Sequence, residues 1–271
     1  MAEIVLYGAA SAAYAGLALW FWSTRWRAPA PARAGLTILE RALLLAPLAL
    51  HGWLLYAEIF LAPQLRFGFA QALSAMLWLG VLIYWTESLF LRLDGFEPLL
   101  LPLAALAAPL PAIFPGMASR GVPASAEFRL HLALAMAAYS VFTIAMLHAV
   151  LMAILERRLH QKQGLALGLP PLLTLERLLF RLIGAAFVLL TLTLATGLLY
   201  SESLFGRALR FDHKTLFALL SWATFAGLLA GRHFYGWRGR TALRWTLAGF
   251  VMLMLAYVGS RFVLEVMLGR G

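Results

Sequence analysis

Eight runs of mainly apolar residues divide this chain, and each is long enough to cross a bilayer as a helix of about 20 residues. They cover residues 4–23, 39–61, 69–91, 97–115, 129–153, 178–200, 213–231 and 245–268. Because lipid offers no hydrogen-bond partners to the backbone, such runs fold as helices that satisfy their own backbone groups. The pattern predicts an all-α fold, a polytopic membrane helical bundle of about eight transmembrane helices.

The composition supports this class and excludes others. Hydrophobic residues make up 63% of the 271 residues and charged residues only 13%, about half the charged fraction of soluble domains. The net charge of +10 comes from small basic clusters between the apolar runs, a distribution typical of membrane topology rather than of nucleic-acid binding. Since the chain has no cysteine, disulfides and thiolate metal sites are excluded. We expect residues 1–271 to form a single membrane domain.

The connections between the runs alternate in charge. Most basic residues lie in the odd-numbered connections, which carry Arg25, Arg27, Arg33, Arg92, Arg157, Arg158, Lys162, Arg177, Arg232, Arg238, Arg240 and Arg244. Basic connections tend to stay in the cytoplasm, so both termini are expected on the external, periplasmic side of a bacterial inner membrane. The first run follows Met-Ala-Glu and no basic segment, which predicts a retained span rather than a cleaved signal peptide.

The fourth run differs from the others because it is rich in proline, with Pro98, Pro102, Pro109, Pro111 and Pro115. Proline lacks a backbone N–H and kinks a helix. This span is therefore expected to be bent or partly unwound, with neighbouring helices supporting it.

Histidines inside the apolar runs are the candidate ligand-binding residues, because a membrane helix rarely keeps an imidazole without a partner. His131 lies near the external start of the fifth run, His51 near the middle of the second, and His233 at the cytoplasmic end of the seventh. Ligand binding and simple hydrogen bonding between helices both stay open for His51 and His131. His148 lies about 25 Å deeper than His131 along one helix, so these two cannot share one metal ion.

The remaining polar residues indicate narrower roles. His148, His160 and His213 favour structural or solvated positions, and Asp212 is placed to cap the helix that follows it. Arg261 either snorkels to the interface or meets an acidic cofactor group such as a propionate. The sequence shows no nucleophile triad, phosphate loop, HExxH motif or carboxylate cluster, so binding is favoured over catalysis. Haem fits this pattern, because it needs one or two axial ligands and an apolar slot.

Several stretches resemble the cytochrome c assembly proteins of the CcsA/CcmC type, most closely the small YpjD/HemX-like branch. Residues 128–140 resemble the histidine-led helix of that family, and residues 211–222 resemble its tryptophan-rich external motif with the following helix. Further resembling stretches are 175–177 (Leu-Glu-Arg), 189–200, 236–240 (Gly-Trp-Arg-Gly-Arg) and 256–261. The resemblance covers nearly the whole chain and is most specific from 128 to 268.

This resemblance implies haem handling, since larger members of the family export haem and present it to apocytochrome c outside the membrane. By position, His51 matches the first membrane histidine and His131 the first external one, both as haem iron ligands. The reduced external motif includes Asp212 and leads into Trp222, while Arg261 lies in the last resembling stretch.

The sequence departs from the larger members at two of their histidines. His233 lies about one turn beyond the second membrane position, which is occupied by Ala230, and the final external histidine has no counterpart before Gly271. The resemblance therefore does not imply a complete external pair of histidines.

We expect an inner-membrane protein that binds and positions haem in cytochrome c assembly, through His131, His51, His233, Asp212, Trp222 and Arg261. Expected partners are haem and a membrane or soluble protein of the cytochrome c or haem pathway, and no nucleic acid. Two alternatives stay open. One is a HemX-like regulatory or stabilising partner of tetrapyrrole synthesis that acts through arginine-rich loops. The other is an ion or small-solute transport component with Glu87 on its path.

Overall fold

The computed structural model describes residues 2–27, 35–61, 67–91, 95–116, 126–161, 172–205 and 213–268. In this part of the chain every regular element is helical and no strand occurs. Seven of the described helices are long and apolar enough to cross a membrane, and a shorter apolar segment covers Glu97–Ile113. The predicted all-α membrane bundle of about eight segments is confirmed.

The chain begins with α1 (Ala2–Phe21), which continues as the π-helical turn η1 (Trp22–Trp26). The rest of the first half contains α2 (Ile38–Tyr56), η2 (Ala57–Leu61), α3 (Phe69–Phe90), α4 (Glu97–Ala107) and α5 (Leu110–Ile113). The second half contains α6 (Ala126–His160), α7 (Leu172–Phe205), α8 (His213–Tyr235) and α9 (Gly239–Met254). The last span continues as η3 (Leu255–Gly259), α10 (Ser260–Phe262) and η4 (Val263–Met267).

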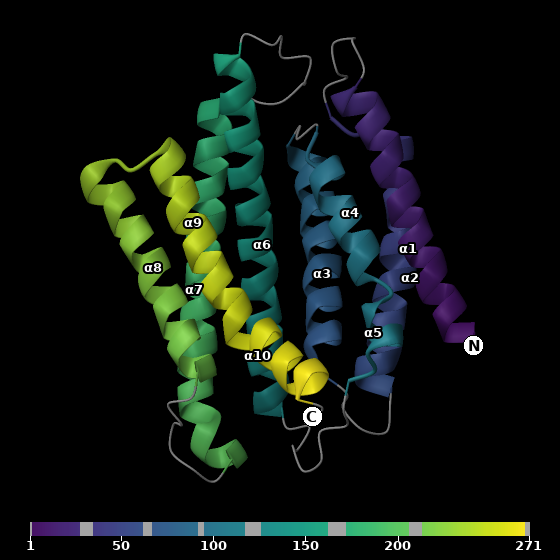
Figure 1. Cartoon of the computed structure of the whole chain (residues 1–271), viewed down its shortest axis with the longest axis vertical. Coiled ribbons are helices and arrows are strands. Elements are labelled where there is room, and N and C mark those ends of the chain that lie inside the picture. The colour runs from purple at the N-terminus through teal and green to yellow at the C-terminus, as the bar shows by residue number, and fades with distance from the viewer. Residues whose placement is uncertain are drawn as a thin grey trace.

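Helix α6 joins the two halves of the bundle, because it packs against α3 on one side and against α7 and α9 on the other. Helices α1 to α5 lie on one side of it and α7 to α9 on the other (Figure 1). Consecutive segments run in opposite directions, so the beginning of α1 and the end of η4 lie at the same end of the bundle. This path is the one expected for an even number of crossings.

The proline-rich segment is broken, as the sequence predicts. Pro98 lies in the first turn of α4, where a missing N–H is tolerated, and Pro102 lies inside the helix. Helix α4 ends at Ala107, and after Pro109 the chain forms only the four-residue α5. Proline chemistry thus divides this segment into two short helices.

Two helices extend beyond the apolar runs that predicted them. Helix α6 has 35 residues and α7 has 34, whereas the runs cover only 129–153 and 178–200. The additional turns contain charged residues with good helix propensity, such as Glu156, Arg157 and Arg177. Apolar content therefore marks the part of a helix that suits lipid, and not where the helix ends.

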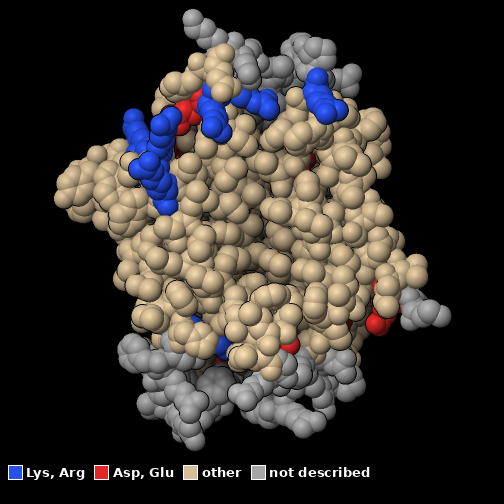
Figure 2. Space-filling view, in the orientation of Figure 1, with Lys and Arg blue, Asp and Glu red and all other residues tan. Residues whose placement is uncertain are grey.

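Lys and Arg side chains gather at the end of the bundle opposite the two termini, while the middle of the face shown is almost free of charge (Figure 2). That end contains the last turn of the first helix, the end of α6 and the start of α9. The described arginines on these segments are Arg25, Arg157, Arg158, Arg238 and Arg240. We call it the arginine-rich end. The basic residues that lie in alternate connections along the sequence therefore gather at one end of the fold.

Candidate functional site

His131 lies in the second turn of α6, at the end of the bundle that also holds the two termini. Its half-buried ring faces α7, where Nδ1 is 3.0 Å from the hydroxyl oxygen of Thr196. A Cβ atom added at Gly197 would lie 3.2 Å from Cε1 of His131, so the ring sits where position 197 has no side chain. Helix α7 therefore holds the imidazole through a hydroxyl group and a close backbone approach.

The hydrogen bonds of Thr196 indicate which nitrogen of His131 carries the proton. The Thr196 hydroxyl donates within its own helix, to the carbonyl oxygens of Leu192 at 2.8 Å and Thr193 at 3.0 Å. A hydroxyl has only one proton, so while Thr196 donates to either carbonyl it can only accept from Nδ1–H of His131. In that tautomer the lone pair belongs to Nε2.

His51 is completely buried in α2 and is enclosed by its neighbours. Its Nε2 is 2.8 Å from the hydroxyl oxygen of Ser74 on α3. Its ring meets Tyr14 of α1 edge to face, with the centroids 5.8 Å apart. Within the described structure, neither Nδ1 of His51 nor the hydroxyl of Tyr14 has a hydrogen-bond partner, although both atoms are buried. Three helices thus surround His51 and leave two polar atoms unsatisfied.

The two histidines are held separately. His51 contacts the Ser74 hydroxyl and His131 the Thr196 hydroxyl, and the described residues show no contact between the two rings. His233 is exposed at the end of α8, beside the ring of Phe234. It therefore lies at the opposite end of the bundle from His131. The pairing of these histidines around one iron ion stays a prediction.

The other predicted cofactor residues have protein partners or cannot be described. Trp222 of α8 donates from Nε1 to the Thr191 hydroxyl at 2.9 Å and stacks on Phe187 with the centroids 5.4 Å apart. Asp212 lies outside the described residues.

Arg261 lies on the last span, toward the end that holds the termini. One guanidinium nitrogen is 3.8 Å from Glu265, one turn further along, and the guanidinium carbon is 5.9 Å from the centre of the Tyr257 ring. Its Nε is buried and has no hydrogen-bond partner in the described structure. Arg261 thus keeps a donor beyond the contact with Glu265.

His148 has the structural role that the sequence favours. It is completely buried, its Nδ1 is 2.8 Å from the carbonyl oxygen of Ile144, and its ring packs on Phe96 at 4.4 Å. Glu87 is half-buried near the arginine-rich end, with one carboxylate oxygen that has no partner among the described residues. The transport role of Glu87 and the regulatory role of the arginine-rich loops stay predictions.

Sequence reasoning missed the residues that hold the two histidines. Thr196 and Gly197 lie within the resembling stretch 189–200, and Ser74 is a hydroxyl in an apolar run. Such isolated polar or small positions are the available signal, because helix contacts in membranes favour small and hydroxyl residues. The signal does not say which histidine each one meets.

Comparison of the sequence with known proteins shows the family of this chain. The family model described as cytochrome C assembly protein matches residues 37–268. The chain belongs to the cytochrome c assembly protein family. The matched residues of this family member include His51, His131, His233 and Arg261, whereas Tyr14 on α1 lies before them. The resemblance drawn from the sequence is confirmed.

Curated relatives agree with this assignment. The inner membrane protein YpjD of Escherichia coli strain K12 is 38% identical over 136 residues, which are 49% of this chain and 51% of that protein. This family member thus spans about half the length of the YpjD proteins that it matches. An "uncharacterized 28.8 kDa protein in nifR3-like 5'region" of Azospirillum brasilense is 35% identical over 215 residues, 73% of this chain and 76% of that one.

A further relative is the cytochrome c biogenesis protein CcsA of Gloeobacter violaceus. It is 33% identical over 92 residues, which are 34% of this chain and 27% of that protein. No solved structure matches the chain.

Proposed function

We propose that this protein binds haem and positions it in the membrane during cytochrome c assembly, with Nε2 of His131 as the principal ligand atom. The observation that carries the proposal is the His131–Thr196 hydrogen bond, which leaves the Nε2 lone pair free on a half-buried ring. Metal-ligating histidines commonly donate their other N–H to a neighbouring group, which sets the tautomer and the ring orientation. Family membership supports haem as the ligand.

His51 meets the requirements of a haem ligand only in part. Its Nδ1 is buried without a partner, which is unfavourable unless a ligand or water supplies one. However, the ring is enclosed by Tyr14 and Ser74, so ligation at this position requires these neighbours to move. We assign His51 the secondary role, and we keep His233, Asp212 and Trp222 as candidates that rest on the resemblance.

A bound haem would supply an iron ion that a histidine nitrogen can ligate, and the role of the chain is to bind the haem and orient the histidine. Thr196 fixes the direction of the His131 ring, and the missing side chain at Gly197 leaves room for the ring beside α7. The partly exposed guanidinium of Arg261 is the donor group we assign to a haem propionate. We expect a membrane or soluble protein of the cytochrome c or haem pathway to be the partner in transfer.

We also propose that the arginine-rich end faces the cytoplasm. The positive-inside rule supports this orientation, because it concerns arginines close to the ends of spans, as Arg157, Arg158 and Arg240 are. His131 and both termini then lie toward the external face of an inner membrane.

The direct test is a titration of the detergent-purified protein with hemin, followed by absorption spectroscopy. We expect the Soret band of free hemin to shift and the shift to saturate near about one haem per protein, because a histidine-ligated iron has a distinct spectrum. The absence of any band shift with excess hemin would overturn the proposed function.

The close approach at Gly197 allows a matched test on one helix. A Gly197→Val variant is expected to weaken hemin binding by about 10–100-fold, because the added side chain moves the His131 ring away from Thr196. Gly184→Val is the control, since a Cβ atom at position 184 of the same helix meets nothing within 4 Å. Equal hemin affinities for the two variants, measured by the same titration, would contradict the role assigned to the His131–α7 contact.

A further inference from the structure

Two of the resembling stretches have no part in the haem proposal, and they meet at the arginine-rich end. Glu176 of α7, from the Leu-Glu-Arg stretch, forms ion pairs with Arg232 at 2.7 Å and with Arg238 at 3.3 Å. Arg238 and Arg240 belong to the Gly-Trp-Arg-Gly-Arg stretch, and Nε of Arg240 is 4.0 Å from the Glu156 carboxylate of α6. These ion pairs attach the turn between α8 and α9 to both α6 and α7.

The backbone of this turn is shaped by glycine. Gly236 and Gly239 have φ angles of 65° and 52°, a region that side chains disfavour. The ring of Trp237 lies directly on Gly231, where a Cβ atom would overlap it. The turn therefore folds back toward α8 and holds its arginines in place.

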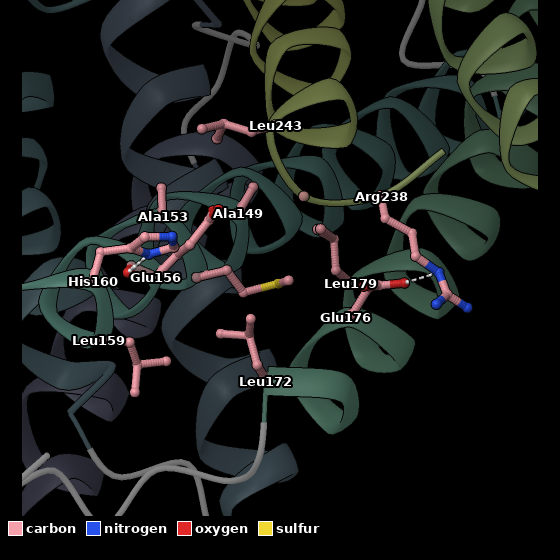
Figure 3. A pocket seen from close by; sticks show the side chains of 12 residues that line it. Ala149, Ala153, Glu156, Leu159, His160, Leu172, Glu176, Leu179, Arg238 and Leu243 are labelled. Carbon is pink, nitrogen blue, oxygen red and sulfur yellow. Dashed lines mark hydrogen bonds and ion pairs between the residues drawn. The ribbon is translucent and has the colours of Figure 1, made fainter. Parts of the chain in front are cut away.

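A cavity of about 340 Å³ lies beside this turn, between α6, α7 and the start of α9 (Figure 3). In the figure, the Glu176–Arg238 pair lies on one side of the cavity, and Glu156 and His160 lie on the other. The volume is at the lower end of the range for small-ligand pockets. Most of its wall is apolar, formed by Ala149, Met152, Ala153, Leu172, Leu179 and Leu243.

Three arginines surround the two carboxylates beside the cavity. Arg238, Glu156 and Glu176 line it, whereas Arg232 and Arg240 contact these carboxylates from outside the lining. Glu176 is paired with both Arg232 and Arg238, and Glu156 is paired with Arg240. The side chains of Arg238 and Arg240 are 61% and 78% exposed, so both guanidinium groups have donors left for an anion. The rim therefore suits a negatively charged group and the wall suits a hydrocarbon.

The position of the cavity indicates the source of such a ligand. It lies near the ends of membrane-spanning helices, where lipid head groups meet arginine side chains. Leu159, which lines the cavity, is 45% exposed, and Leu173, next in the chain to the lining residue Leu172, is 63% exposed. An acyl chain can thus pass from the lipid past apolar side chains into the cavity.

We infer that this cavity binds an anionic phospholipid, with one acyl chain among the alanines and leucines and the phosphate at Arg238 and Arg240. This lipid site is separate from His131, which lies at the other end of α6. It is independent of whether the protein binds haem.

The test is native mass spectrometry of the detergent-purified protein after incubation with equal amounts of phosphatidylglycerol and phosphatidylcholine. We expect phosphatidylglycerol to be retained over phosphatidylcholine by roughly tenfold, since each arginine near a head group favours anionic lipid. The exposed pair Arg238→Gln and Arg240→Gln should bring this ratio close to one. Ala153→Phe, which fills the cavity, should lower the retention of phosphatidylglycerol to a similar degree.

The control is Arg129→Gln, which removes an exposed arginine at the other end of α6 and should leave the lipid ratio unchanged. Equal retention of the two lipids by the unaltered protein would overturn the inference. Displacement of phosphatidylglycerol by millimolar inorganic phosphate would also overturn it, because recognition would then need the head group alone. If the arginine variant and the control retain lipid equally, the site does not lie at this cavity.

Discussion

Replacing His131 with alanine is expected to weaken hemin binding by at least about 100-fold, because the substitution removes the proposed iron ligand itself. The expected loss exceeds that of the Gly197→Val variant, which displaces the imidazole but keeps it. The bundle should stay folded, since the ring is only half-buried and forms one hydrogen bond with a side chain of α7, that of Thr196. Hemin titration measures the affinity, and gel filtration in detergent measures the folded fraction.

Matched histidine variants make this result specific. His160→Ala removes an exposed imidazole at the end of α6 opposite His131, and we expect its hemin affinity to equal that of the unaltered protein. His51→Ala should weaken hemin binding less than His131→Ala, because the His51 ring is enclosed by Tyr14 and Ser74. A His131→Ala variant that binds hemin with unaltered affinity would exclude His131 as the principal ligand.

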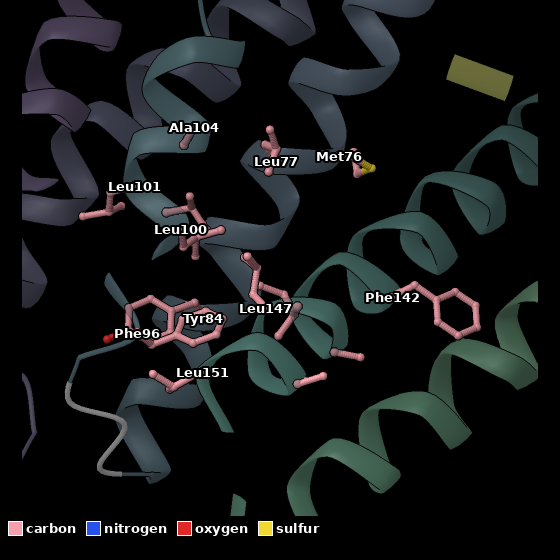
Figure 4. Packing of buried hydrophobic residues seen from close by; sticks show 14 of the residues in the cluster. Met76, Leu77, Tyr84, Phe96, Leu100, Leu101, Ala104, Phe142, Leu147 and Leu151 are labelled. Atoms are coloured by element: carbon pink, nitrogen blue, oxygen red, sulfur yellow. The ribbon is translucent and has the colours of Figure 1, made fainter. Parts of the chain in front are cut away.

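Replacing Glu97 with alanine is expected to lower the free energy of unfolding by about 2–5 kcal/mol, since buried donors left without acceptors cost roughly 1–3 kcal/mol each. The Glu97 carboxylate is completely buried at the start of α4. It accepts from the Tyr84 hydroxyl at 2.6 Å and from the backbone N–H of Gly95 at 2.9 Å. Tyr84 stacks on Phe96 with the ring centroids 5.2 Å apart (Figure 4). Phe96 in turn packs on His148 of α6. The carboxylate therefore anchors a contact that joins α3, α4 and α6.

Thermal unfolding in detergent measures this effect, and we expect the melting temperature of Glu97→Ala to fall by roughly 10 °C. Glu3→Ala is the control, because Glu3 is exposed near the start of α1, and its melting temperature should be unchanged. Tyr84→Phe should cost less than Glu97→Ala, since the carboxylate then keeps the backbone donor of Gly95. Equal melting temperatures for Glu97→Ala and Glu3→Ala would show that the buried carboxylate does not support the bundle.

The prediction from sequence was most accurate where the physical property is local. Each of the eight apolar runs corresponds to a helical segment, and the prolines of the fourth run correctly predicted a broken helix. Helices α6 and α7 were predicted too short, because charged residues such as Glu156 continue a helix after the apolar run ends. Hydropathy reports which solvent surrounds a helix, and it carries no information on where the helix stops.

The candidate site was predicted only in part. His51 and His131 were recognised because an imidazole in an apolar run is rare, but Ser74, Thr196 and Gly197 were not connected with them. A histidine paired with a hydroxyl group on another helix leaves no periodic pattern in either helix. The cavity at the arginine-rich end was missed for the same reason, since its wall comes from three helices.

The sequence by itself determined the membrane class, the number of apolar segments, the gathering of arginines at alternate connections and the family, because these depend on composition and order along the chain. Only the tertiary structure decided that Nδ1 of His131 meets the Thr196 hydroxyl, and that Glu176 and Glu156 hold the arginines of the α8–α9 turn. These contacts depend on which helices are neighbours and on their rotation about their axes. Both are decided by packing across the whole bundle, which no single stretch of sequence specifies.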